Sequence, residues 1–281
     1  MRRVWFNGAR FPNGVLTVDA GERGLLLGDG LFETMLVVNR TALWGNMHLA
    51  RLEASAKEMG LPFARDVADD AIAALLDDAP ETHHVLRVSL TRGASARGLA
   101  ANGGPPSLLV TLDPFDPSLM FQPVSLVTSA IRRNTHSPSS RLKTLSYVDN
   151  IMAAREAASH GAEDALMLNT EGHAACSTIA NLFLMKNGAL VTPARDQGIL
   201  TGVMRQALIA AAQHIGIATE ERAVHADELK TADAVFLTNS LRFIRPVKSL
   251  DREALAQADV SALVTALSDA ARLQCGRDLA S

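Results

Sequence analysis

The stretch S-R-L-K-T-L-S-Y-V-D-N (residues 140–150) gives the strongest indication of the fold, because it places a lysine among apolar residues directly before a predicted helix. A lysine is ordinarily a solvated surface charge, and residue type alone favours that role for Lys143. Partial burial lowers the pKa of an ammonium group and makes it a nucleophilic amine. Such an amine can bond to an aldehyde cofactor and later move a proton of the substrate. Lys143 is therefore the candidate catalytic residue.

Two further motifs carry groups that suit an anionic ligand. T-G-V-M-R-Q begins a predicted helix just after Gly202, and the first backbone N–H groups of a helix suit a phosphate. The flexible loop R-G-A-S-A-R-G (92–98) holds Arg92 and Arg97, and an arginine can grip a carboxylate with two hydrogen bonds. Taken alone, each motif fits an ordinary loop or surface charge equally well.

The composition is that of an ordinary globular protein of 281 residues with one or two domains. Hydrophobic residues make up 48% and charged residues 20%, and a net charge of −3 gives no basic excess for nucleic acid. We find no signal-peptide pattern and no apolar run of about 18 residues, so no membrane partner is expected. Two cysteines without CxxC spacing and eight histidines without ligand spacing predict no disulfide framework and no metal site. This usage favours a reducing cytoplasm.

Hydrophobic periodicity and turn residues predict a mixture of hairpins and helices. We predict strands at residues 3–6 and 15–18 (paired as a hairpin), 31–38, 84–92, 107–112, 124–128, 164–169, 181–186, 190–193 and 235–240. We predict helices at residues 46–60 (with Asn46 as a possible N-cap), 66–77, 147–161, 203–215 and 253–273. The lack of regular βαβ alternation favours an α+β fold. The prolines of D-P-F-D-P predict a linker at 114–124 between domains at 1–113 and 125–281.

Together the motifs resemble those of the class IV aminotransferases, the fold-type IV enzymes that use pyridoxal 5′-phosphate (PLP). They occur in the family's order from about residue 5 to 250: G-D-G-L-F-E-T (28–34), the arginine loop, the lysine segment, A-N-L-F (180–183), G-V-M-R-Q (202–206) and T-N-S-L-R-F-I-R-P-V (238–247). The resemblance implies a two-domain architecture like that of D-amino acid aminotransferase, with an N-terminal α/β sandwich, a C-terminal pseudo-barrel and PLP at the domain interface. It also implies a homodimer in which each site borrows a loop from its partner.

The resemblance assigns roles to individual residues. Lys143 would bind PLP covalently, and Arg92 and Arg97 would bind the carboxylate of a small-molecule substrate. Tyr147, four residues after the lysine, would touch the phenolic oxygen of the cofactor. The phosphate would be held by an arginine from H-L-A-R-L, by the turn before a helix and by a hydroxyl in a late strand: Arg51, Gly202, Val203, Met204 and Ser240.

One position departs from the family. The family's usual run is T/S-E-x-x-x-x-N-L-F, whereas this chain has A-C-S-T-I-A-N-L-F, so Cys176 stands where a glutamate holds a proton on the pyridine nitrogen. A thiol is a weak hydrogen-bond donor and carries no stable negative charge at neutral pH. Cys176 itself fits a small buried hydrophobe that lies against the cofactor.

The motifs are most similar to those of the aminodeoxychorismate lyases of folate biosynthesis. That similarity implies cleavage of 4-amino-4-deoxychorismate to 4-aminobenzoate and pyruvate. One alternative is a transaminase of D-amino or branched-chain amino acids; the arginine loop favours the lyases over the branched-chain enzymes, whereas D-amino acid transaminases also have an arginine at the position of Arg97. The other is a fold-type IV scaffold that has lost catalysis and acts as a binding protein, which Cys176 would explain. Retention of the cofactor separates this last alternative from the two enzymes.

Overall fold

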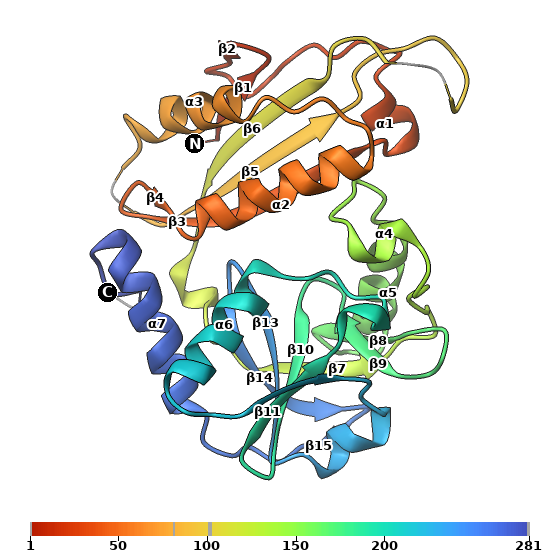
Figure 1. Ribbon diagram of the computed structural model, residues 1–281, viewed down its shortest axis with the longest axis vertical. Coiled ribbons are helices and arrows are strands. Elements are labelled where there is room, and N and C mark those ends of the chain that lie inside the picture. The colour runs from red at the N-terminus through yellow and green to blue at the C-terminus, as the bar shows by residue number, and fades with distance from the viewer. Residues whose placement is uncertain (1, 81, 101–102, 280–281) are drawn as a thin grey trace. The chain divides into compact units, whose positions relative to one another are not determined.

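The computed structural model describes residues 2–80, 82–100 and 103–279. The chain forms two compact units (Figure 1). The first unit comprises Met1–Pro117, Leu142–Ser146 and Arg272–Ser281, and the second comprises Ser118–Arg141 and Tyr147–Ala271. Each unit combines helices with a sheet, which confirms the predicted α+β class.

The first unit is built on a six-stranded antiparallel sheet with the order β2-β1-β6-β5-β3-β4. Its strands are β1 (Arg3–Phe6), β2 (Ala9–Arg10), β3 (Gly30–Val38), β4 (Thr41–Ala42), β5 (His84–Thr91) and β6 (Ser107–Pro114). The central strand β3 is buried along almost its whole length. It pairs with β5 from Gly30 to Val37, whereas β4 covers only Val37 and Val38 on its other edge. At the first residues of β3, one edge is therefore not covered by β4 and can hydrogen-bond to another segment.

Helices α2 (Gly45–Glu58) and α3 (Arg65–Leu76) lie against this sheet (Figure 1). Leu49, Leu52 and Ala56 recur on one face of α2 and pack into the same core as Met35 of β3. Full burial of each leucine contributes about 1.5–3 kcal/mol. Two further helices are α1 (Arg23–Leu27) and the C-terminal α7 (Ser261–Cys275).

The second unit contains a sheet that closes on itself. Its strands are β7 (Val124–Thr128), β8 (Asp164–Leu168), β9 (Ala174–Ser177), β10 (Asn181–Lys186), β11 (Ala189–Pro193), β12 (Thr219–Arg222), β13 (Ala234–Asn239), β14 (Phe243–Leu250) and β15 (Glu253–Ala254). The order is β12-β11-β10-β13-β14-β7-β8-β9, and β9 returns to β10 through the pair Cys176–Asn181. This closure gives a barrel-like sheet. Its α-helices are α4 (Pro138–Arg141), α5 (Val148–Ser159) and α6 (Val203–His214), and its 3₁₀ turns are η1 (Pro117–Leu119), η2 (Arg195–Gln197) and η3 (Ala226–Thr231).

Three local predictions were wrong. Residues 15–18 form no strand, and Val15 is 76% exposed, because β1 pairs instead with β2 and β6. The last helix begins at Ser261 rather than 253, since residues 253–254 pair with β14 as β15. Asn46 does not cap α2: the helix begins after Trp44 in the left-handed conformation, and the Asn46 amide oxygen accepts from Arg65. In the part of the chain that is described, no helix is long and apolar enough to cross a membrane.

Candidate active site

Lys143 is carried by a short segment that hydrogen-bonds to the open edge of β3. The Phe32 amide donates to the Lys143 carbonyl at 2.9 Å, and the Leu145 amide donates to the Gly30 carbonyl at 2.9 Å. Gly30 is required here, because a Cβ on it would lie 2.6 Å from the Leu90 carbonyl oxygen. The motif G-D-G-L-F-E-T thus supplies the strand edge that fixes the backbone of the lysine.

The surroundings of Lys143 favour the neutral amine. Its Nζ lies 4.4 Å from the ring centroid of Phe32, and the residue is half-buried. Desolvation lowers the pKa of Lys143 to about 8; the positive charges of Arg51 and Arg87 act in the same direction, and Glu33 opposes them. A sizeable fraction of the amine is therefore unprotonated near neutral pH, as a nucleophile or general base requires.

This lowered pKa predicts a pH-dependent stability of the cofactor-free protein. The unfolded chain, with a lysine pKa near 10.5, holds more protons than the folded chain between pH 8 and 10.5. The free energy of unfolding contributed by Lys143 should therefore rise with pH across that window. Lys143→Met removes this titration, so the variant should be more stable than the parent below pH 8, with a difference that shrinks as the pH rises.

Urea unfolding of both cofactor-free proteins from pH 7 to 9.5 measures this difference. Lys57→Met, at an exposed position of α2, is the matched control and should show no such trend. A Lys143→Met difference that stays constant over the whole range would contradict the assigned pKa.

A buried cluster of charged and polar groups adjoins the lysine on the same unit. Glu33 of β3 accepts from Arg51 Nε at 2.8 Å and from Arg51 Nη2 at 2.6 Å, and its Oε2 lies 2.6 Å from His48 Nδ1. Glu33 and His48 are each 1% exposed. Burial acts to raise the pKa of Glu33, but Arg51 and the His48 hydrogen bond outweigh it and bring that pKa to about 2.

His48 completes this cluster as a neutral donor. Burial lowers the pKa of His48, although Glu33 acts in the opposite direction. A neutral imidazole facing a carboxylate at Nδ1 must carry its proton there, so Nδ1–H donates to Glu33. Sequence reasoning assigned no role to Glu33 or His48, although both stand inside quoted motifs, G-D-G-L-F-E-T and H-L-A-R-L. Their positions could have indicated a role, because Glu33 lies on β3, whose edge binds the lysine segment, and His48 lies on α2, which carries Arg51.

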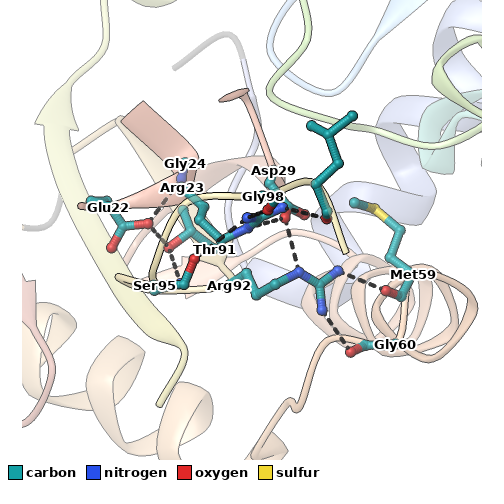
Figure 2. A network of polar contacts seen from close by, with 12 residues as sticks. Glu22, Arg23, Gly24, Asp29, Met59, Gly60, Thr91, Arg92, Ser95 and Gly98 are labelled. Atoms are coloured by element: carbon teal, nitrogen blue, oxygen red, sulfur yellow. Dashed lines mark hydrogen bonds and ion pairs between the residues drawn. The ribbon is translucent and has the colours of Figure 1, made fainter. Parts of the chain in front are cut away.

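The two arginines of the predicted carboxylate loop have different surroundings, and Figure 2 shows those of Arg92. Arg92 Nε donates to Asp29 Oδ2 at 2.8 Å, and its two terminal nitrogens donate to the carbonyls of Gly60 and Met59 at 3.0 and 2.9 Å. Arg97 is exposed. The contacts of Arg92 are with the protein itself and support the loop, whereas Arg97 is exposed; the binding of a substrate carboxylate by either arginine remains a prediction.

The predicted phosphate turn lies on the second unit at the start of the twelve-residue helix α6. Gly202 is its N-cap, and a Cβ there would lie 2.1 Å from Asn181 Oδ1, so the turn requires glycine. Val203 and Met204 are the first residues of the helix, and the first N–H groups of a helix have no partner within it. Their role in binding phosphate remains a prediction.

The remaining predicted site residues also belong to the second unit. Tyr147 is the N-cap residue of α5, and Ser240 follows β13; both are half-buried. Cys176 lies on β9, is 7% exposed and packs in an apolar cluster with Met167 and Ile199. Burial raises the pKa of the Cys176 thiol, with Asp164 adding to the effect and Arg133 opposing it. The thiol is therefore protonated and neutral at physiological pH.

The predicted site residues thus fall into two groups. Lys143, Arg51, Arg92 and Arg97 belong to the first unit. The second unit holds Tyr147, Cys176, Gly202, Val203, Met204 and Ser240. Within the first unit, the structure brings Lys143 and Arg51 together around Glu33.

The sequence as a whole matches a described family. The model of amino-transferase class IV covers residues 30–250. The chain belongs to the class IV aminotransferases. An aminotransferase of this class depends on PLP, and solved relatives include PLP-bound forms. The family, the fold-type IV architecture and the PLP cofactor predicted from the motifs are confirmed, and the protein is an enzyme.

Relatives of this class IV aminotransferase carry more than one activity in their names. A putative branched-chain-amino-acid aminotransferase of Methanocaldococcus jannaschii is 28% identical over 95% of this chain and 94% of its own length. An aminodeoxychorismate lyase of Bacillus subtilis is 29% identical over 88% of this chain and 86% of its own length. The solved structure of a putative 4-amino-4-deoxychorismate lyase from Legionella pneumophila is 33% identical, with a TM-score of 0.86, and covers 92% of this chain and 96% of its own.

PLP has three groups that a protein must accommodate: the aldehyde, the phosphate and the pyridine nitrogen. The residues of this chain suit the first two. Lys143, with a pKa of about 8, suits the aldehyde, and the turn at Gly202 begins α6, whose first N–H groups suit a phosphate. The third group is the pyridine nitrogen. A buried neutral thiol at Cys176 suits an unprotonated nitrogen better than a protonated one.

Proposed function

We propose that the protein is a PLP-dependent lyase that converts 4-amino-4-deoxychorismate to 4-aminobenzoate and pyruvate, a reaction of folate biosynthesis. The Legionella pneumophila and Bacillus subtilis relatives carry names that support this assignment. We further propose that it works in the cytoplasm as a homodimer.

The observation that carries the proposal is the buried, neutral Cys176. PLP supplies an electron sink when bound, and the sink is strongest when the ring nitrogen is protonated. A transaminase depends on a strong sink, because its carbanion-like intermediate must persist long enough to be reprotonated at another carbon. A lyase that forms an aromatic product has its own driving force, so it tolerates the weaker sink that a thiol provides.

The proposed roles of the chain's own residues follow from their chemistry. Lys143 Nζ removes the proton from the amine-bearing carbon of the substrate, and its pKa of about 8 leaves enough neutral amine for this task. The substrate's C–O bond then breaks, the ring becomes aromatic, and the released enolpyruvate gains a proton to give pyruvate. Arg97 would orient the substrate through a carboxylate, and Arg51 would hold the cofactor phosphate.

The test measures lyase and transaminase products in parallel. Formation of 4-aminobenzoate from 4-amino-4-deoxychorismate is followed by chromatography, because pyruvate alone also arises from alanine. Amino transfer from D-alanine and from L-leucine to 2-oxoglutarate is followed by glutamate formation. Lyase product without glutamate supports the proposal, whereas glutamate alone would assign a transaminase. Retained PLP with neither product would assign a binding protein.

Cys176→Glu is expected to raise transaminase activity more than lyase activity. The new carboxylate would hold a proton on the ring nitrogen and strengthen the electron sink, and that proton supplies the partner which a buried carboxylate needs. Both activities are measured in parent and variant, with a melting curve to establish folding. Cys275→Glu, at the other buried cysteine, is the control for a carboxylate introduced elsewhere. A folded variant that gains neither activity would refute this account of Cys176.

A further inference from the structure

A buried ion-pair network supports the loop that carries Arg97 (Figure 2). Arg23, 5% exposed, donates through Nε to Asp29 Oδ2 at 2.8 Å. Its terminal nitrogens donate to the main-chain carbonyls of Gly98 at 2.8 Å and Leu99 at 3.0 Å. One guanidinium therefore holds the two residues that directly follow Arg97.

Asp29 joins this guanidinium to a second one. Its Oδ2 also accepts from Arg92 Nε at 2.8 Å, and Arg92 in turn donates to the carbonyls of Met59 and Gly60 at the end of α2. Burial acts to raise the pKa of Asp29, but the hydrogen bonds from Arg92 and Arg23 outweigh it and lower that pKa. The carboxylate thus stays charged at physiological pH and anchors both arginines.

Glu22 secures the two ends of the same loop. It is 6% exposed and accepts from Thr91 Oγ1 of β5 at 2.7 Å and from Ser107 Oγ of β6 at 2.8 Å. The neighbouring Arg23 amide donates to the Gly93 carbonyl at 3.0 Å. The loop is therefore fixed where it leaves β5, where it enters β6, and just after Arg97.

Arg97 itself takes no part in the network. Within residues 2–80, 82–100 and 103–279, no side-chain hydrogen bond or ion pair of Arg97 is present, and the residue is exposed. The main chain is hydrogen-bonded at Gly93 and at Gly98, on either side of Arg97, and the Arg97 guanidinium can therefore donate to a ligand. A ligand that meets a loop already ordered loses less conformational entropy on binding than one that must order it.

We infer that Arg23 and Asp29 are positioning residues that hold the Arg97 loop in the form that binds a ligand carboxylate. This inference rests on the proposed function for the identity of the ligand. It predicts that disturbing the network weakens recognition of a carboxylate while cofactor binding and the chemical step are retained.

The experiment compares 4-aminobenzoate with 4-aminobenzamide, which differ only in the carboxylate, as ligands of the PLP-loaded protein by calorimetry. Arg23→Lys keeps the charge opposite Asp29 but loses the forked reach to two carbonyls. It should weaken 4-aminobenzoate about 3- to 10-fold and 4-aminobenzamide less than about 2-fold, with KM for 4-amino-4-deoxychorismate rising in parallel and kcat within about 2-fold. Asp29→Asn should act in the same direction, and Arg97→Lys provides the direct comparison.

Two further measurements and a control variant separate positioning from general damage. PLP affinity, read from the absorbance of the bound cofactor, should not change, and amide hydrogen exchange at residues 95–99 should become faster in the Arg23 and Asp29 variants. Arg10→Lys, at an exposed arginine of β2, is the matched control. If Arg23→Lys does not fold, the isosteric Asp29→Asn gives the same comparison.

The outcomes distinguish this inference from the proposed function. An unchanged preference for 4-aminobenzoate in the Arg23 and Asp29 variants would overturn the inference, as would an Arg97→Lys variant whose preference for the acid equals that of the parent. A parent protein that prefers the acid and loses this preference in the variants supports the inference even if it does not cleave 4-amino-4-deoxychorismate, in which case only the proposed lyase function fails. A parent that shows neither preference nor cleavage would overturn both.

Discussion

Lys143→Ala is expected to abolish the covalent attachment of PLP and to reduce turnover by at least roughly 10³-fold, since it removes both the amine that binds the cofactor and the proposed general base. Borohydride treatment of the parent should fix PLP to the peptide that contains Lys143. The same treatment of the variant should leave no labelled peptide. Both results are read by peptide mapping, which does not depend on the identity of the substrate.

The matched control is Lys57→Ala, at an exposed position of α2, which should keep both the label and the activity. Label on Lys57, Lys186, Lys230 or Lys248 in the parent would overturn the assignment of Lys143. Added methylamine offers a second test, because an external amine can replace part of the missing proton transfer. Partial recovery of turnover in the variant would support the role of Lys143 as general base.

Glu33→Gln is expected to lower the free energy of unfolding by about 3 kcal/mol at neutral pH, because it takes the carboxylate from a half-buried guanidinium and a buried imidazole. The folded pKa of Glu33, about 2, lies below its ordinary value of 4.5. Its contribution is therefore present above pH 4.5 and is lost as the pH falls towards 2. The difference between parent and variant in urea unfolding should shrink over that range.

The same variant tests whether the cluster prepares Arg51 for a phosphate. Glu33→Gln should weaken the binding of PLP more than the binding of pyridoxal, because pyridoxal lacks the phosphate that would contact Arg51. Glu53→Gln, an exposed glutamate on α2, should change neither stability nor the ratio of the two affinities. Equal weakening of PLP and pyridoxal would show that Arg51 serves the fold and not the phosphate.

Hydrophobic patterns along the chain predicted the longer helices and strands that have a regular pattern. The largely apolar run of β3, the partial alternation of β5 and the periodicity of α2, α3 and α6 place these elements within one or two residues of the structure. Strand β14 escaped prediction because Pro246 interrupts its pattern, and its pairing with β7 joins segments far apart in the chain. Short pieces such as α1 and β9 carry too few residues for a period to show.

The residues of the candidate site also divide into those that a local motif identified and those whose contacts no local motif shows. Lys143 and Cys176 stood out through motifs, because each occupies a fixed place in a local pattern. The ion pair between Arg92 and Asp29 was not predicted, since no local signal shows that Asp29 lies within reach of Arg92. Glu33 and His48 were missed for a related reason: their proximity depends on α2 crossing β3, a contact that the spacing of residues along the chain does not reveal.

The attachment of the lysine segment to β3 also bears on the order in which the chain matures during synthesis. A ribosome completes residues 1–117 first, then residues 118–141 of the other unit, and only then the Leu142–Ser146 segment that fills the open edge of β3. A nascent chain that stops at residue 117 has the sheet strands of the first unit but no reactive amine on them. The proposed attachment of PLP to Lys143 would therefore have to wait until translation has passed into the second unit.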